Sequence, residues 1–331
     1  MINVTTIIDA IILHCDDSVL GLQIGNGYTF KKTYIKDLTF KDKITDGRGQ
    51  INISYFDSIM SDEGGEYFIC LNKNSVYQIE TPLSGSGIYT DKDMRCENQI
   101  DEHNHSETNY LHRIFSLLRL YKVGNIGTKE IFIENSFSIG ILKNNLKCTS
   151  DNITKNITDE RVFSLSEEEL RECNQFLNDY SENEYSMMKN SIDEFVWGLD
   201  QIDEATGFEQ YTTALEMTLL SHNQQGKKEV LSKRVAVMLE PMNPDINNTY
   251  LKMKEFYRYR SESLHEGNGQ NISRQELFEM EEIVRKILKK CLNRCKTELS
   301  TTSTITWAEI KRKIIGELKG KVVFAETTGI F

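Results

Sequence analysis

Phe256-Tyr-Arg-Tyr-Arg-Ser-Glu-Ser-Leu-His265 closes a predicted helix that begins at Tyr250. Gly267 follows almost directly, and glycine is typical of positions just after a helix end. Arg260 and His265 therefore stand near a helix end, where a guanidinium can clamp a phosphate and an imidazole can carry a proton. These are two of the groups that RNA cleavage without a metal requires.

The five-residue spacing between Arg260 and His265 sets a condition on how the two residues act together. In a straight helix this offset is about 140° around the axis, because a turn takes 3.6 residues. The two side chains then lie on different faces. They converge only if the helix ends or frays before His265, which Gly267 permits. At such an end the helix dipole favours the protonated imidazolium.

The rest of the C-terminal half predicts one helix after another. Ser166 with Glu169, and Ser273 with Glu276, form capping boxes that mark helix starts. Apolar residues at helical spacing predict helices over 166–177, 187–201, 209–220, 228–240, 250–264, 273–299 and 307–318, followed by a strand over 321–325. This half is therefore predicted to be an all-α helical bundle.

The N-terminal half predicts mostly β structure. Asn26-Gly27 is a turn signal between short apolar stretches. Short β-prone runs predict strand pairs at 66–71 with 76–80, around a polar turn at 72–75, and at 130–134 with 137–142.

Two segments of this half depart from the β pattern. Residues 109–121 have apolar side chains at helical spacing, whereas residues 91–107 are polar and predict a long exposed loop. A further polar segment, at 151–159, predicts a linker. The predicted fold class is α+β, with a β-rich regulatory or sensor domain at 1–155 and a helical domain at 160–331.

The histidines and cysteines do not predict a metal site. His103 and His105 stand in the polar loop without a further ligand at a familiar spacing. Cys291 and Cys295 lie one helical turn apart, but they extend an apolar stripe and are interpreted as small hydrophobic residues. We therefore expect no metal and no cofactor.

The compartment is predicted from the cysteines and from the apolar runs. Seven cysteines without a Cys-x-x-Cys pair are typical of reduced thiols in the cytosol. The apolar run at 7–13 is too short to span a membrane, and the first residues lack the positive region of a signal peptide. We expect a cytoplasmic protein that does not enter a membrane.

The net charge of −11 argues against a general nucleic-acid binder, but the charge is unevenly distributed. Residues 227–296 hold 15 lysines and arginines against 10 acidic residues, and they include Arg260 and His265. Two interpretations stay open: a local surface that meets phosphates, or the solvated face of the last long helix. That helix carries Arg285, Lys286, Lys289, Lys290 and Arg294.

Three motifs follow one another in the C-terminal half. They are Leu215-Glu216 in one helix, Arg234-Val-Ala236 in the next, and Tyr257-x-x-Arg260-Ser261 before His265. Their order and gaps resemble the Apea-like branch of the HEPN family. The resemblance covers about residues 164–296 and extends to the closing helix after the third motif.

The resemblance implies a HEPN-type helical bundle and a metal-independent endoribonuclease that acts by 2′-hydroxyl transphosphorylation. It further implies a homodimer through the helical domain, in which two Arg…His motifs face each other in one cleft. Arg260 would hold the phosphate and His265 would act as acid or base, with Glu216 orienting Arg260. Tyr257, Arg258 and Ser261 would support them. Glu216 as an ordinary surface carboxylate, and Tyr257 as a core aromatic residue, stay open as alternatives.

By the same resemblance the chain is a toxin or an anti-phage defence effector, and a phage or host trigger would act on the N-terminal domain. The alternative is a catalytically inactive HEPN module that dimerises or binds RNA or a partner, with a β-rich sensor domain attached. In a third interpretation the helical half is only a scaffold for that sensor.

Overall fold

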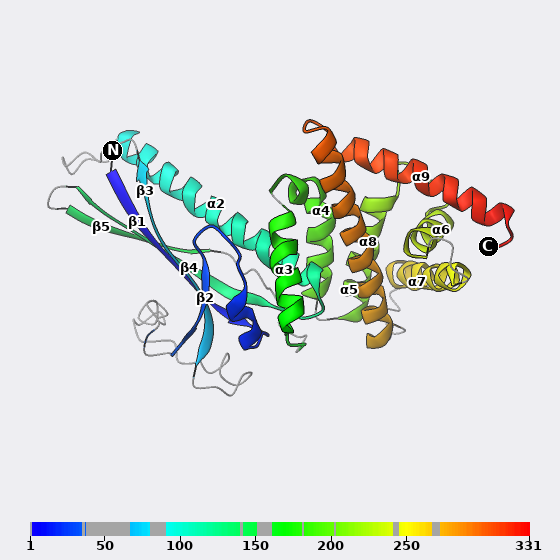
Figure 1. The fold of residues 1–331 in the computed structure, drawn as a ribbon, viewed down its shortest axis with the longest axis horizontal. Coiled ribbons are helices and arrows are strands. Elements are labelled where there is room, and N and C mark those ends of the chain that lie inside the picture. Colours follow the sequence, from blue (N-terminus) through cyan, green and yellow to red (C-terminus); the bar gives the residue numbers. More distant parts are fainter. Residues whose placement is uncertain are drawn as a thin grey trace. The chain divides into compact units, whose positions relative to one another are not determined.

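The computed structural model describes residues 2–34, 37, 67–79, 91–139, 142–150, 161–180, 182–201, 203–240, 245–266 and 272–331. The chain forms two compact units, Met1–Leu177 and Asn178–Phe331. The N-terminal unit contains an antiparallel sheet, and the described part of the C-terminal unit is helical (Figure 1). The predicted α+β fold class is confirmed.

The sheet has the strand order β2-β3-β1-β4-β5, and all neighbouring strands are antiparallel. Its strands are β1 (Ile2–Leu13), β2 (Thr29–Thr33), β3 (Phe68–Ile79), β4 (Gly127–Ile139) and β5 (Leu142–Ser150). β1 is rich in isoleucine, valine and threonine, which suit a strand with neighbours on both edges. β1 is therefore the centre of the sheet.

One long helix, α2 (Asp91–Tyr121), runs along a face of the sheet (Figure 1). Cys96 and Ile100 of α2 pack against Ile2, Val4 and Ile79 of the sheet. The loop predicted at 91–107 is therefore wrong. The reason is that the buried stripe of α2 includes polar residues, so its helical period is hidden in the sequence.

Those polar residues have partners on the sheet. Asn135 of β4 donates to Asn104 of α2 over 2.9 Å and accepts from Thr6 of β1 over 2.6 Å. All three side chains are buried. In this hydrogen-bonded series, Thr6 donates to Asn135 and Asn135 donates to Asn104. Burial of these groups therefore does not carry the cost of an unmade hydrogen bond.

β3 passes straight through residues 72–75, where a hairpin turn was predicted, so that prediction is wrong. The polar side chains there also find partners: Asn72 donates to Asp9 over 2.6 Å, and Lys73 pairs with Glu107 of α2 at 2.6 Å. Glu107 further accepts from Tyr28 over 2.7 Å. A buried charge is tolerated when it is paired and hydrogen-bonded.

The second predicted strand pair is also wrong in its boundaries. β4 is one strand through 130–139, and it pairs with β1 on one edge and with β5, from Leu142 on, on the other. The Asn26-Gly27 turn is present, with positive φ angles at both residues, but the strand that follows it, β2, pairs with β3. The turn predicted at Asn26-Gly27 is thus present, whereas the turn predicted at 72–75 is not.

Helix α3 (Glu167–Asp179) begins at the predicted capping box, which is confirmed: Glu169 N–H donates to Ser166 Oγ, and Ser166 N–H donates to a Glu169 carboxylate oxygen. Lys122 pairs with Glu169 at 2.6 Å, and Asn174 accepts from the Gln23 backbone over 2.8 Å. Through Leu177 the helix therefore belongs to the N-terminal unit, and the division falls at 177/178 instead of near 155–160. The predicted linker at 151–159 lies outside the described residues.

The C-terminal unit contains the predicted helices, with ends that differ by a few residues. They are α4 (Glu182–Leu199), α5 (Glu204–Leu219), α6 (Lys227–Leu239), α7 (Ile246–Glu266), α8 (Arg274–Thr301) and α9 (Trp307–Thr327). α9 continues through 321–325, so the predicted strand there is wrong. Ile310, Ile314, Leu318 and Ala325 are buried at helical spacing, and this stripe outweighs the local β preference of Val322 and Val323. No helix in the described part of the chain is long and apolar enough to cross a membrane.

Helix α5 packs against α4, α8 and α7, and its aromatic residues are fully buried. A Cβ at Gly198 of α4 would come within 2.5 Å of the Tyr211 ring, so glycine allows α4 to approach α5 closely. On the other side, Phe208 meets Phe256 of α7 edge to face, with ring centroids 5.3 Å apart. This contact sets the distance between α5 and α7, the two helices that carry the candidate site.

Candidate functional site

The last turn of α5 and the C-terminal part of α7 bring three predicted site residues together. Arg260 Nη1 lies 2.9 Å from Glu216 Oε1, and Tyr257 Oη donates to the same oxygen over 2.9 Å. Arg260 Nη1 also donates to Tyr257 Oη over 3.3 Å. The guanidinium carbon lies 5.5 Å from the centroid of the Tyr257 ring. Glu216 therefore holds Arg260 directly and through the tyrosine.

A fourth residue, Lys227, was missed by the sequence analysis. Its Nζ lies 2.8 Å from Glu216 Oε2, the oxygen that Arg260 leaves free. Lys227 begins α6, and its only signal in the sequence is a lysine pair at a helix start. Glu216, Lys227, Tyr257 and Arg260 are called the Arg260 cluster below. In this cluster one carboxylate faces two cations and a phenol, so the formal charge of the cluster is positive.

The cluster is partly sheltered from water. The side chain of Glu216 is 12% exposed and that of Arg260 is 19% exposed. Salt screens an ion pair in such a place less than it screens a pair on the open surface. Burial, and then the hydrogen bond to Glu216, raise the pKa of Tyr257 to about 12. The phenol therefore stays protonated at neutral pH and acts as a donor.

The end of α5, where Glu216 lies, is held by two further cations. Arg234 of α6 donates to the Leu219 carbonyl, and Lys311 of α9 donates to the Met217 carbonyl. Cationic donors suit the last carbonyls of a helix, which are unpaired and partly negative. Burial lowers the pKa of both cations. Arg234 is the arginine of the Arg234-Val-Ala236 motif, so this motif fixes the end of the helix that carries Glu216.

The helix end expected before His265 is not found. α7 continues through His265 to Glu266, two residues past the predicted end at 264. No glycine or proline interrupts 261–266, and the side chains of 262–266 lie outside the described part of the chain. Positions 260 and 265 of a continuous helix are about 140° apart around its axis. The helix geometry therefore does not bring the two positions to one face within a single chain.

The remaining predicted residues do not join the cluster. Arg258 lies 3.5 Å from Glu255 and against the Tyr259 ring, with its side chain half exposed. Ser261 is exposed. His222, the other histidine of the helical half, is exposed in the turn after α5 and lies 2.8 Å from Asn223 Oδ1.

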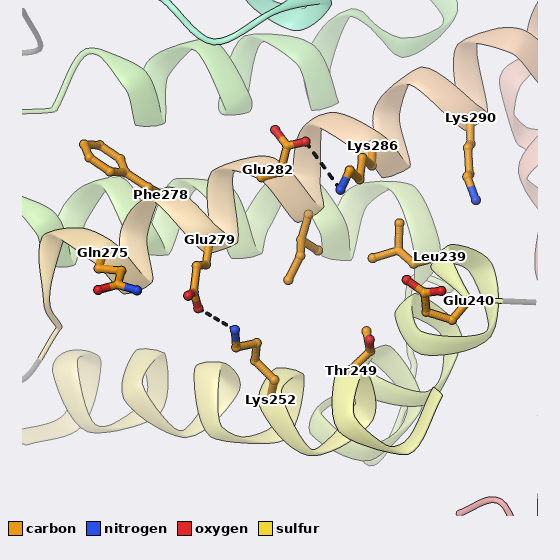
Figure 2. A pocket seen from close by; sticks show the side chains of 11 residues that line it. Leu239, Glu240, Thr249, Lys252, Gln275, Phe278, Glu279, Glu282, Lys286 and Lys290 are labelled. Carbon is orange, nitrogen blue, oxygen red and sulfur yellow. Dashed lines mark ion pairs between the residues drawn. The ribbon is translucent and has the colours of Figure 1, made fainter. Parts of the chain in front are cut away.

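An open groove of about 630 Å³ lies between α7 and α8, near the end of α6 (Figure 2). Lysines and glutamates alternate along it: Lys252 pairs with Glu279 at 2.5 Å, and Lys286 pairs with Glu282 at 3.4 Å. The residues described as lining the groove do not include those of the Arg260 cluster. The groove and the cluster are therefore separate features.

Most basic residues of α8 form ion pairs or hydrogen bonds with other residues of the protein. Arg285 pairs with Glu281 in the core, Arg294 pairs with Glu298 and Glu317, and Lys290 donates to the Met238 carbonyl. Lys286 is one half of a pair in the groove. Much of the basic excess of 227–296 is thus paired with neighbouring carboxylates. Some carboxylates hold two cations: Glu216 holds Lys227 and Arg260, Glu229 holds Lys233 and Lys254, and Glu282 holds Arg285 and Lys286.

The histidines and cysteines considered for metal binding have other surroundings. His103 is part of α2 and stacks on Tyr77, with centroids 3.9 Å apart. Cys291 and Cys295 are buried in α8, and burial raises the pKa of both thiols. Among the described residues, no group of three or more histidines, cysteines or carboxylates has the arrangement of a metal site.

Comparison with known proteins found no family model that matches this chain, no similar curated protein and no similar solved structure. The resemblance to the HEPN family therefore stays a prediction that the three sequence motifs carry.

Proposed function

We propose that this protein is a metal-independent endoribonuclease of the HEPN type. The observation that carries the proposal is the contact between Arg260 and Glu216, at 2.9 Å, with Tyr257 bridging the two. The residues come from two separate motifs, and the resemblance assigned Glu216 the task of orienting Arg260. Both contacts of the guanidinium use Nη1, and Nε is buried without a hydrogen-bond partner among the described residues, so Nη2 is the nitrogen left to donate to a phosphate. A guanidinium held in this way presents a positive charge and a donor in a fixed orientation.

The proposed reaction needs a base, an acid and a cation. The base removes the proton of the 2′-hydroxyl, whose oxygen attacks the neighbouring phosphorus. The bond from phosphorus to the 5′-oxygen breaks, and the acid gives that oxygen a proton. The products are a 2′,3′-cyclic phosphate and a 5′-hydroxyl. Arg260 stabilises the charge that develops on the phosphate oxygens, and imidazole side chains of His265 carry the protons.

The active site is proposed to form in a homodimer. One chain offers a single histidine candidate near Arg260, and one histidine does not occupy both sides of a phosphorus at once. α7 also continues through position 265, which separates this position from Arg260 around the helix. A two-fold axis through the helical unit would bring the histidine of one copy to the arginine of the other.

The proposed setting is the cytoplasm, where the protein acts as a toxin or an anti-phage effector on host or phage RNA. In this proposal the sheet-containing N-terminal unit senses a phage or host trigger and controls the nuclease. Membrane insertion has no part in the proposal.

The alternative is a catalytically inactive HEPN module that dimerises or binds RNA or a partner. One observation favours it: Arg260 is already paired with Glu216 and is only 19% exposed. Under this alternative the pair ties α7 to α5 and has no contact with RNA phosphate.

Cleavage of RNA in the presence of EDTA separates the two functions. We expect the purified protein to cut RNA in EDTA and to leave 2′,3′-cyclic phosphate ends, detected by end-specific ligation. Loss of activity in EDTA with recovery in magnesium or manganese would exclude the proposed mechanism. RNA that is bound but left intact would favour the inactive module.

A further inference from the structure

Lys227 has a place in the Arg260 cluster that charge balance alone does not explain. Glu216 carries one negative charge, and Arg260 already supplies a cation at 2.9 Å. Lys227 adds a second cation at 2.8 Å on the other carboxylate oxygen. The surplus positive charge lies beside the guanidinium proposed to hold a phosphate, so the cluster can accept an anion without separating its own ion pairs.

Helix stability does not explain Lys227 either. Lys227 is the first residue of α6, and its preceding residue, Gly226, provides no side-chain cap. The first turn of a helix is the positive end of its dipole, where a lysine is unfavourable. Lys228 follows it, so two lysines stand at this end, with Glu229 as the acidic residue of the first turn.

The exposure of the two cations differs. The side chain of Lys227 is 45% exposed, whereas that of Arg260 is 19% exposed. An ammonium group has three donors on a flexible stem. Lys227 therefore has donors left for solvent or for a ligand, and it lies at the rim of a site whose inner cation is Arg260.

We propose that Lys227 binds the phosphate that neighbours the one held by Arg260 along an RNA strand. RNA presents one negative charge per nucleotide, and two cations linked by one carboxylate offer adjacent places for consecutive phosphates. The site would then favour strands with at least two consecutive phosphates over a substrate with one. This inference rests on the proposed RNA-binding role of Arg260, but it does not require cleavage.

The first experiment measures binding and not activity. A ten-nucleotide 2′-O-methyl RNA, which lacks the attacking hydroxyl, is titrated by fluorescence anisotropy at several salt concentrations with wild type, Lys227→Gln, Lys227→Arg and Lys228→Gln. We expect Lys227→Gln to weaken binding about fivefold. The slope of log affinity against log salt should fall in magnitude by about 0.7, the value for one contact to single-stranded nucleic acid. Lys227→Arg should restore the slope.

Lys228→Gln is the matched control, because it removes the same charge from the same helix end without touching Glu216. Wild-type affinity and slope in Lys227→Gln, or an equal loss in Lys228→Gln, would overturn the proposal. Absence of RNA binding by the wild-type protein would overturn it as well. Circular dichroism of each variant, with an unchanged melting curve, shows that the fold is kept.

The second experiment measures cleavage of two substrates, a dinucleoside monophosphate and a tetranucleotide with a phosphate on each side of the scissile one. We expect Lys227→Gln to lower kcat/KM for the tetranucleotide through KM, and by several times more than it lowers kcat/KM for the dinucleoside. Equal losses on both substrates would mean that Lys227 only positions Glu216, and the proposal would fall. RNA that is bound in a Lys227-dependent way but never cut would refute the endoribonuclease and leave this inference standing.

Discussion

Arg260 Nη1 lies 2.9 Å from Glu216 Oε1, and this contact joins the C-terminal part of α7 to the last turn of α5. The two residues come from motifs that are separated by a complete helix, α6. The same carboxylate is shared with Lys227, and Tyr257 bridges it to Arg260. The orientation of Arg260 therefore depends on three helices, and changes in any of them should alter the site.

Arg260→Ala is expected to abolish RNA cleavage, because it removes the cation proposed to stabilise the transition state. His265→Ala should do the same by removing the proposed proton carrier. Losses on the order of 10²- to 10³-fold in kcat are typical for such groups. The matched control is Arg258→Ala, which removes an exposed arginine of the same helix and should be clearly more active than Arg260→Ala. A wild-type rate in either alanine variant would refute the assignment of that residue.

Glu216→Gln should reduce activity by weakening the hold on Arg260. The amide keeps the shape of the side chain but loses the charge that attracts Arg260 and Lys227. We expect kcat/KM to fall about tenfold, which corresponds to one charge-assisted hydrogen bond. Tyr257→Phe, which removes only the bridging hydroxyl, should show a smaller loss. Full activity in Glu216→Gln would show that the carboxylate does not position the arginine.

A mixture of Arg260→Ala and His265→Ala proteins tests the shared site under conditions that allow subunit exchange. The heterodimer keeps one arginine and one histidine, whereas each parent homodimer lacks one of the two residue types completely. We expect the rate of RNA cleavage by the mixture to differ from that of both parents. A protein that sediments as a monomer and still cleaves RNA at full specific activity would contradict the shared site.

Glu229 should contribute to stability above its unfolded pKa and lose that contribution in acid. Burial acts to raise the pKa of Glu229, but hydrogen bonds from Lys233, Tyr250 and Lys254 outweigh it and lower the pKa to about 2 from 4.5. Because the folded pKa is the lower one, the stabilisation is complete above pH 4.5 and is lost as the pH falls toward 2. Glu229→Gln removes this dependence.

Melting temperatures of the wild type and Glu229→Gln, compared at pH 5 and pH 2.5, test this pH dependence. On acidification, the melting temperature of the wild type should fall by about 2–4 °C more than that of Glu229→Gln. The expected difference is small because the carboxylate is partly exposed. Glu255→Gln, which changes an exposed carboxylate of α7, serves as the control. Parallel losses in the wild type and Glu229→Gln would contradict the predicted role of Glu229.

Lys73→Met should destabilise the N-terminal unit strongly. Glu107 would remain buried without its ammonium partner, and breaking one half of a buried pair costs about 3–5 kcal/mol. Replacing both partners, Lys73→Met with Glu107→Leu, should restore most of the lost stability. Hydrogen exchange of the β1 and β3 amides measures the effect, and Lys32→Met, which breaks the exposed pair with Asp17, is the control. Unchanged exchange in Lys73→Met would show that the pair does not stabilise the sheet.

The helices of the C-terminal unit were predictable because their signals are local. Capping boxes such as Ser273 with Glu276, and apolar side chains at helical spacing, depend on residues a few positions apart. The failures in the N-terminal unit have the opposite origin. Lys73 and Asn104 look like surface residues in the sequence, and their partners Glu107 and Asn135 lie on other elements. A local pattern does not contain such pairings.

In the candidate site, too, some contacts were predictable from the sequence and others were not. The resemblance implied that Glu216 would orient Arg260, and the structure places the two side chains in contact, with Tyr257 beside them. Lys227 was missed because it reaches Glu216 across the turn between α5 and α6, and a lysine at a helix start carries no signal of that contact. α7 extends to Glu266, two residues past the predicted end at 264.

The hydrogen-bonded chain Thr6–Asn135–Asn104 has a consequence for the mechanics of the N-terminal unit. An interface of aliphatic side chains alone would let α2 slip along the sheet by one turn, about 5.4 Å, with similar packing in both positions. Such a slip would separate Asn135 from Asn104 and Lys73 from Glu107, and would leave these polar groups buried without partners. α2 therefore has one axial position on the sheet, and any shift of the helix along its axis would first have to break these contacts.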